Sequence, residues 1–280
     1  MVRRQIVKVT LMRTTLHLVT ARDYPVFNAA MNDIAVSRLR PETLEIAERV
    51  SAGVRSFFGE GPRTRREVMD WLERKGIPPL DPEWITWFAL KSRSHLAHDP
   101  ATALWRARPA GVYVALAGVV APDPNAARVE VIQRYLGAFG PATRADVAKW
   151  SGLRVGDIAP ALDALEPLRR FLDEQGRELL DLPRAPLPPA DTPAPVRFLP
   201  KWDNLLLAHA DRRRVIAGER LRGMIATTGE VSQSLLVDGM VAGTWSVAGG
   251  RVIVKPFDPL PRSARREVEE ERARLEAFVR

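Results

Sequence analysis

The sequence has no cysteine, which excludes disulfides, thiolate metal sites and cysteine nucleophiles. It also has no apolar run of the ~18 residues that a membrane-spanning helix needs. Residues 1–10 alternate charged and β-branched side chains, which is not the pattern of a signal peptide. The glycine patterns of phosphate and dinucleotide loops are missing too. These absences favour a cytoplasmic protein without a membrane contact, a nucleotide or any other cofactor.

Acidic residues are fewer than basic ones, with 34 Asp plus Glu against 42 Lys plus Arg and a net charge of +8. Arg far outnumbers Lys. This balance favours a polyanionic partner such as nucleic acid, although a genomic bias toward Arg, Ala and Pro would give a similar composition. The 280 residues are 46 % hydrophobic and can bury one large core or several small ones.

The chain opens with a predicted β-hairpin, because Val7–Leu11 and Leu16–Val19 alternate apolar and polar side chains. A lone hairpin is only marginally stable, so this one must pack against later residues or against residues outside the sequence. Thr20 and Asp23 have the spacing of a capping box and predict a helix that begins after them.

One segment recurs at a fixed offset, which is typical of tandem structural repeats. The matching residues are Arg55, Gly61, Pro62, Thr64, Arg65, Val68 and Trp71 in the first copy and Arg134, Gly140, Pro141, Thr143, Arg144, Val147 and Trp150 in the second. Every pair is 79 residues apart, without a gap. We therefore expect two copies of one fold.

Each copy has the predicted order of a winged helix, three helices followed by a two-stranded wing. In the first copy we expect the third helix at Glu83–Ala97 and the wing at Leu104–Arg108 and Val112–Leu116. In the second copy the wing is expected at Leu168–Leu172 and Glu178–Leu182.

A different domain is predicted after Pro183 to Pro195, a proline-rich and semi-rigid linker. Short strands are expected at Arg222–Thr228, Ser234–Val237, Gly243–Val247 and Val252–Pro256, and a helix at Ser263–Val279. The predicted fold class is α+β, with tandem winged-helix modules followed by a small antiparallel β-barrel or sheet domain. The expected segments are 1–40 (remnant of a first winged helix), 41–120 and 121–183 (winged helices), 184–196 (linker) and 197–280 (C-terminal domain).

Basic residues fall where a winged helix contacts DNA, at the second and third helices. They are Arg63, Arg65, Arg66, Lys91 and Arg93 in the first copy and Arg144, Lys149 and Arg154 in the second. Each residue taken alone fits an ordinary solvated face equally well, and one copy could be a scaffold for protein contacts. As a group they predict a DNA-binding surface.

The hairpin supplies three further candidates, since Arg13, Thr15 and His17 share one face if the segment is extended. His17 could act as an acid, a base or a phosphate donor, or it could be a structural hydrogen-bonding residue. His95 and His98 have no evident third ligand, so no metal site is expected.

Asp203, Arg212 and Arg214 lie close together in sequence after the linker. The two arginines suit phosphate binding. Asp203 could instead cap a short helix or pair with an arginine.

Four segments resemble a winged-helix family that includes bacterial DNA glycosylases acting on interstrand crosslinks and bulky alkyl adducts. They are Leu11–Leu18, Gly140–Gly152, Phe198–Asp203 and Leu236–Trp245. The resemblance spans almost the whole chain and implies three tandem winged helices with a C-terminal β-barrel around a concave DNA-binding channel. Many members of the family are known only as DNA-binding proteins.

Catalysis in that family is ascribed to a Gln-x-Gln or Gln-x-Asp motif upstream of the hairpin, where the polar pair positions water. The only glutamines here are Gln5, Gln133, Gln175 and Gln233, and none has Gln or Asp two residues later. By the family pattern, either the true start lies upstream of Met1 or the chain is a variant without the catalytic part. No catalytic residue is predicted.

The predicted partner is double-stranded DNA, damaged DNA included, held in a basic channel without catalysis. Two alternatives stay open. One is excision of alkylated or crosslinked purines by base–sugar hydrolysis, and the other is transcriptional regulation.

Overall fold

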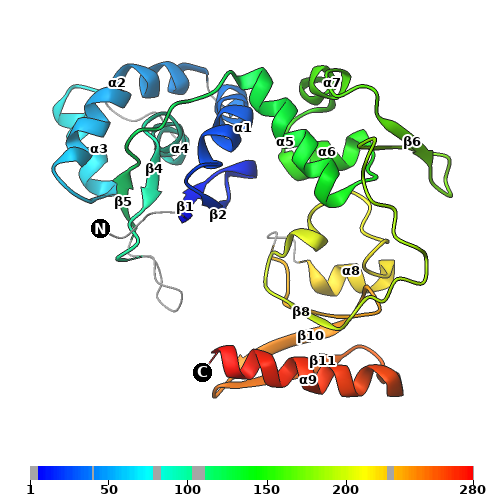
Figure 1. Cartoon of the computed structure of the whole chain (residues 1–280). Helices are drawn as coiled ribbons and strands as arrows, with labels where there is room; N and C mark the ends of the chain where they lie inside the picture. The colour runs from blue at the N-terminus through cyan, green and yellow to red at the C-terminus, as the bar shows by residue number, and fades with distance from the viewer. Residues whose placement is uncertain (1–5, 40, 78–82, 103–110, 226–229, 280) are drawn as a thin grey trace. The chain divides into compact units, whose positions relative to one another are not determined.

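A computed structural model describes residues 6–39, 41–77, 83–102, 111–225 and 230–279. The chain divides into two compact units, Met1–Pro183 and Arg184–Arg280, and each is described by itself (Figure 1). Helices and small antiparallel sheets occur together, as the predicted α+β class requires. Within the described ranges, no helix combines the length and the apolar character needed to cross a membrane.

The first unit begins with the predicted hairpin, formed by β1 (Ile6–Thr10) and β2 (Leu16–Thr20) in antiparallel register. A short 3-10 turn, η1 (Met12–Thr14), joins the two strands. One face of the hairpin carries Val7 and Val9, which are buried against residues of later elements. This burial supplies the support that an isolated hairpin lacks.

Helix α1 (Tyr24–Leu39) follows the hairpin directly and contacts three other helices. Its start is the capping arrangement expected from the sequence, with the Thr20 hydroxyl 2.8 Å from a carboxylate oxygen of Asp23. The backbone N–H of Asp23 donates to the Thr20 hydroxyl at 3.1 Å. One of the two backbone bonds of the predicted capping box is therefore recorded, and the helix begins at Tyr24, directly after Asp23.

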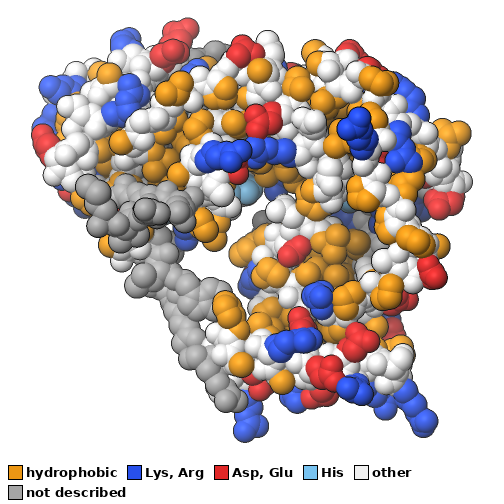
Figure 2. All heavy atoms as spheres, viewed as in Figure 1, with side chains coloured by type: hydrophobic (Ala, Val, Ile, Leu, Met, Phe, Trp, Pro, Cys, Tyr) orange, Lys and Arg blue, Asp and Glu red, His pale blue; other side chains and the backbone are white. Residues whose placement is uncertain are grey.

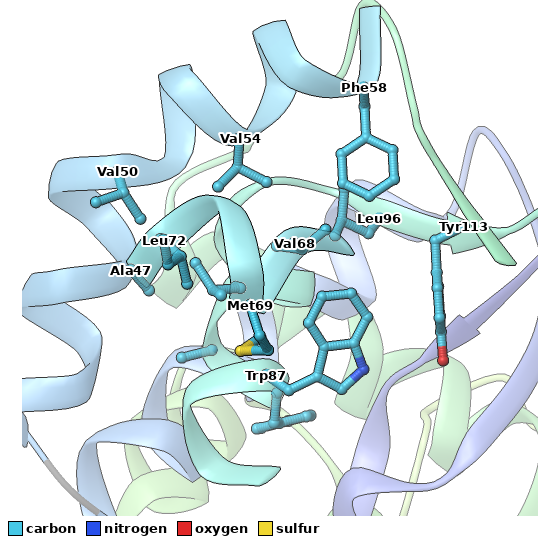
Figure 3. Packing of buried hydrophobic residues seen from close by; sticks show 13 residues of the cluster. Ala47, Val50, Val54, Phe58, Val68, Met69, Leu72, Trp87, Leu96 and Tyr113 are labelled. Carbon is cyan, nitrogen blue, oxygen red and sulfur yellow. The ribbon is translucent and has the colours of Figure 1, made fainter. Parts of the chain in front are cut away.

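The first repeat consists of α2 (Pro41–Gly59), α3 (Arg65–Arg74) and α4 (Glu83–Arg93). A three-stranded sheet completes it, in the order β3 (Arg63–Thr64), β5 (Val112–Ala115), β4 (Leu96–His98). Figure 3 shows side chains from all three helices and from both longer strands meeting in one core. The apolar residues at helical spacing in the sequence are those that fill it.

The third helix of this repeat is shorter than predicted, because α4 ends at Arg93 and Leu96–His98 forms a strand instead. His95 lies between them with a φ of 54°, a left-handed conformation that a helix cannot continue through. The strand β4 pairs with β5, and Leu96 lies opposite Ala115. The expected wing strand Leu104–Arg108 lies outside the described residues.

The second repeat has the same order of elements. Its helices are α5 (Pro124–Phe139), α6 (Arg144–Ser151) and α7 (Val155–Asp163), and its hairpin pairs β6 (Arg169–Leu172) with β7 (Glu178–Asp181). The two hairpin strands lie within one residue of the predicted bounds at each end. Trp150 of α6 packs against Tyr135 of α5, with 4.9 Å between ring centroids. In the first repeat, Trp71 of α3 stacks on Phe57 of α2, with 5.7 Å between ring centroids. In both repeats the tryptophan therefore packs the second helix against the first.

The second unit is built around a four-stranded antiparallel sheet in the order β11-β10-β9-β8. The strands are β8 (Arg197–Leu199), β9 (Ser234–Val237), β10 (Met240–Ala248) and β11 (Arg251–Pro256), and the helical segments are η2 (Asn204–Leu206), α8 (Gly218–Met224) and α9 (Arg262–Val279). Helix α9 contacts β8 and β11, and its Val268 packs with Leu235 and Val196.

Of the strand expected at Arg222–Thr228, residues 222–224 belong to α8 instead, whereas Ile225 forms an isolated antiparallel bridge with Val231. Leu221 and Met224 explain the difference. They are three residues apart and pack into the same apolar cluster, which is the spacing of one helix face. Residues 226–228 lie outside the described part of the chain.

Candidate nucleic-acid interface

The second helix of each repeat begins with the same cap. In α3 the Thr64 hydroxyl accepts from the Glu67 N–H at 3.2 Å, and the Glu67 carboxylate accepts from the Thr64 N–H at 2.7 Å. In α6 the corresponding distances between Thr143 and Asp146 are 3.1 and 2.8 Å. Arg65 and Arg144 are the first helical residues after these caps. Both repeats therefore hold an arginine at a fixed helix start.

The three arginines around the start of α3 have different surroundings. Arg63 pairs with Glu60 at 2.8 Å and lies over the Phe57 ring. Arg65 pairs with Glu83 at 2.5 Å. The Arg66 side chain is 91 % exposed. Arg66 is thus the most available of the three to a ligand in solution, whereas the other two are held in place by neighbours.

Lys91 on α4 is half-buried and approaches the hairpin. Its Nζ donates to the Thr10 hydroxyl at 2.6 Å and lies 5.9 Å from the centre of the Trp87 ring. Burial, with the nearby charge of Arg65, lowers the pKa of Lys91 to about 8. Arg93, two residues further along α4, lies 3.8 Å from Glu48 instead.

In the second repeat, Lys149 and Arg154 are exposed at helix ends, and Arg144 is half-buried. The backbone N–H of Arg154 donates to the Asp157 carboxylate at 2.9 Å, which fixes the start of α7. Each of the three long basic side chains therefore extends from the first or last turn of a helix.

The hairpin residues do not share one face as expected. Arg13 lies in η1 with a φ of 54°, so the segment is not extended there. Its guanidinium donates to the backbone carbonyl of Trp150 near the end of α6. His17 lies opposite Val9 in the hairpin, and Thr15 is exposed. A left-handed turn, which the alternation of apolar residues did not reveal, separates Arg13 from the other two.

His17 has a local partner, since its Nδ1 lies 3.0 Å from the carbonyl oxygen of Thr15. Burial lowers the pKa of His17 below its ordinary value, and the carbonyl of Thr15 opposes this shift. The ring is therefore more neutral near pH 7 than a solvated histidine is.

In the second unit, Asp203 has the capping role that the sequence left open. Its carboxylate accepts from the Leu205 N–H at 2.9 Å, at the start of η2. Arg212 is half-buried, and burial lowers the pKa of its guanidinium. Its Nε is buried and has no hydrogen-bond partner among the described residues. Arg214 is exposed.

Sequence reasoning missed the polar residues that surround Lys91. Thr10 is bonded to it, and Lys8 and Lys91 both act electrostatically on the ring of His98. These groups come from β1, α4 and β4, which are far apart in the sequence. No local signal could have found them, because they meet only through the packing of the hairpin against the first repeat.

Charge on the molecular surface is mixed. Figure 2 shows Lys and Arg side chains interspersed with acidic and apolar ones over the face in view. Among the described residues, no three His, Cys, Asp or Glu side chains are grouped as metal ligands would be.

Comparison with known proteins gives one consistent result. A family model described as DNA glycosylase AlkZ-like matches residues 1–278. The interstrand DNA cross-link repair glycosylase of Streptomyces sahachiroi is 28 % identical over 169 residues, 55 % of this chain and 43 % of that protein, so the match spans less than half of the curated relative.

A solved structure, that of the Streptomyces sahachiroi DNA glycosylase AlkZ, has a similar fold, with a TM-score of 0.78. The structural match covers 99 % of this chain and 80 % of the Streptomyces sahachiroi protein, and the two sequences are 22 % identical. This likeness concerns the fold alone. The family model, which matches nearly every residue, carries the assignment: the chain belongs to the AlkZ-like DNA glycosylase family.

Proposed function

We propose that this chain binds double-stranded DNA, including damaged DNA, and that its two repeats are winged helices that contact the phosphates. The observation that carries the proposal is the pair of identically capped helices, each with an arginine at its first residue. A helix start combines free backbone N–H groups with a favourable dipole, so a basic side chain there adds to an existing preference for phosphate.

Six of the proposed DNA-binding residues fall into two groups by their ion pairing. Lys149 and Arg154 have no ion pair to an acidic side chain among the bridges recorded for the described residues, and Arg66 makes only a long approach of 4.0 Å to Asp70. Arg63, Arg65 and Arg93 are ion-paired with glutamates and would have to exchange these for phosphate. We expect the first group to contribute more to affinity, since its binding requires no such exchange.

We further propose that the chain, as printed, binds DNA without removing a base. The family resemblance places catalysis on a Gln-x-Gln or Gln-x-Asp motif, and none of the four glutamines begins one. Hydrolysis of a base–sugar bond needs a positioned water, and polar side chains at this spacing would supply the positioning. Family membership favours the competing function, base excision from damaged DNA, and the two predict different products.

A paired assay tests both proposals. Fluorescence anisotropy with duplexes that do or do not contain an alkylated purine should show binding that weakens steeply between about 50 and 200 mM salt, because phosphate contacts release counterions. The same tubes are then treated with mild alkali to reveal abasic sites. Binding without strand cleavage supports the proposal. Abasic product would establish excision, and affinity that does not change with salt would contradict phosphate contacts.

A further inference from the structure

Lys91 combines burial with the lack of an acidic partner among the residues that the structure describes. Its ammonium group is half-buried, and in the described part of the chain its one hydrogen bond is to the neutral hydroxyl of Thr10. A buried charge without a counter-ion is unfavourable and is usually paired in a folded protein. The missing partner is therefore expected to be an anion from outside the chain.

We propose that Lys91 is a preorganised site for one phosphodiester of the DNA backbone, and that DNA affinity therefore depends on pH near and above neutrality. The inference rests on the proposed DNA binding and deepens it. It distinguishes Lys91 from the exposed basic residues, which are expected to bind phosphate equally well over the same pH range.

A buried polar network holds the partner of Lys91 in place. The Asn32 side chain donates to the backbone carbonyl of Thr10 at 3.2 Å and to the side-chain carbonyl of Asn28 at 2.8 Å. The hydroxyl of Ser92, next to Lys91 on α4, donates to the same Asn28 oxygen at 3.2 Å. The network joins α1, α4 and β1, so Thr10 and Lys91 are fixed relative to each other before any ligand arrives.

The charged groups around Lys91 reinforce the preference for an anion. Arg65 at the start of α3 acts on Lys91, and Lys91 and Lys8 of β1 act on His98 of β4. Arg65 also acts on Tyr113 of β5. Arg65 is itself paired with Glu83 at 2.5 Å. The local field is therefore positive, and an added phosphate would relieve the mutual repulsion.

His98, on which Lys91 acts electrostatically, is a second polar residue in this part of the fold with an unsatisfied atom. Its side chain is only 8 % exposed, and its Nδ1 is buried without a hydrogen-bond partner in the described part of the chain. It lines a cavity of about 160 Å³ together with Lys8 and apolar residues of the hairpin and of β5. A polar atom left unsatisfied beside this cationic cluster is costly in the free protein, and a ligand with polar atoms would offset the cost.

Protonation and phosphate binding must be coupled if the proposal is correct. Lys91 is mostly charged at pH 7 and mostly neutral at pH 9 in the free protein, since burial sets its pKa at about 8. A charge-assisted hydrogen bond to phosphate should make DNA bind roughly tenfold more tightly to the protein with a charged Lys91 than to the protein with a neutral Lys91. By linkage, the same tenfold factor raises the pKa of Lys91 by about one unit in the complex.

The experiment compares wild type with Lys91→Gln and with the matched charge-removing variant Lys255→Gln, which changes an exposed lysine of β11. In Lys91→Gln the introduced amide keeps an N–H group for Thr10 while the charge is lost. The dissociation constant for a short duplex is measured at constant ionic strength from pH 7 to pH 10. Melting temperatures measured in parallel establish that each variant is folded.

We expect Lys91→Gln to bind roughly tenfold more weakly than wild type at pH 7, and the two to converge by about pH 10. The logarithm of the affinity should also fall less steeply with the logarithm of the salt concentration in the variant, by about the slope that one phosphate contact contributes. The ratio of the dissociation constants of Lys255→Gln and wild type should stay constant across the pH range. The proposal would be overturned if the ratio of the dissociation constants of Lys91→Gln and wild type stayed constant with pH, or if it equalled one at pH 7.

Thr10→Val separates positioning from charge, because valine keeps the shape of threonine without its hydroxyl. The isolated ammonium should then titrate at lower pH, and the pH dependence of affinity should move with it. Inorganic phosphate serves as the second arm. If millimolar phosphate alone raises the melting temperature of wild type but not of Lys91→Gln, the site takes free phosphate rather than a DNA phosphodiester. Failure of wild type to bind DNA at all would instead refute the proposed function.

Discussion

Arg13 shows how one side chain can serve the fold where the sequence suggested a ligand. Its guanidinium donates to the carbonyl of Trp150, and the backbone of Gly152 passes close by, so that a Cβ there would lie 3.0 Å from the Arg13 side chain. Gly152 has a φ of 78°, the left-handed conformation that commonly ends a helix. A cation at the end of α6 also complements the helix dipole.

Arg13→Met should therefore lower the free energy of unfolding by about 1–3 kcal/mol, the usual range for a lost hydrogen bond to a charged group. Denaturant titration measures the change. Arg66→Met is the matched control, because its side chain is 91 % exposed, and it should change stability by less than about 0.5 kcal/mol. Equal stability of Arg13→Met and wild type would show that the contact with Trp150 contributes nothing and that Arg13 is available to DNA.

His98 gives the fold a dependence on pH. Burial, together with the charges of Lys8 and Lys91, lowers the pKa of His98 from its ordinary value of 6.5 to about 4. The unfolded chain therefore takes up a proton at this residue between pH 6.5 and 4 while the folded chain does not. The stabilisation is complete above pH 6.5 and is lost as the pH falls toward 4.

His98→Phe keeps an aromatic ring against Tyr113, and in wild type the two ring centroids are 4.5 Å apart. The substitution removes the group that titrates. Wild type should lose roughly 2 kcal/mol more than this variant between pH 7 and pH 4. His17 and His95 also have lowered pKa values and keep their share of the acid sensitivity in both proteins. Parallel stability curves for the two proteins would refute the assignment to His98.

Helix starts depend on residues that are close together in the sequence. A cap is a local arrangement of residues three apart, so Thr64 with Glu67 and Thr143 with Asp146 could be found without any knowledge of tertiary contacts. The end of α4 and the helical structure of α8 could not be predicted from such local patterns. His95 adopts a left-handed conformation that its sequence context does not require, and α8 is helical because Leu221 and Met224 pack into one core.

The equivalence of the two caps can be measured. Thr64→Ala and Thr143→Ala should each destabilise the protein by about 1 kcal/mol, since each removes an acceptor for a helix-starting N–H. The two sites lie in different repeats without shared partners among the recorded hydrogen bonds of the described residues, so the double variant should lose the sum of the two effects. Thr64→Ser and Thr143→Ser keep the hydroxyl and should lose much less. A double variant no less stable than either single one would contradict independent caps.

At the scale of the whole molecule, the sequence predicted a linker but did not indicate which distant segments pack together. The proline-rich segment was visible in the composition, and the division into units at Pro183 falls at its start. The cluster around Lys91 was not visible, because β1 and β4 contribute to it from distant positions in the sequence and pack together only through nonlocal burial.

The division makes a prediction about proteolysis. Strand β7 ends at Asp181 and β8 begins at Arg197, and the intervening residues around Arg184 are mostly exposed. Exposed backbone without regular structure is cut most readily, so brief digestion with trypsin should first cleave after Arg184 and leave two fragments that resist further digestion. Arg184→Gln should abolish this cut without changing the melting temperature. If the first cut fell inside either unit instead, the units would be less stable than the segment between them, and the two-unit description would be wrong.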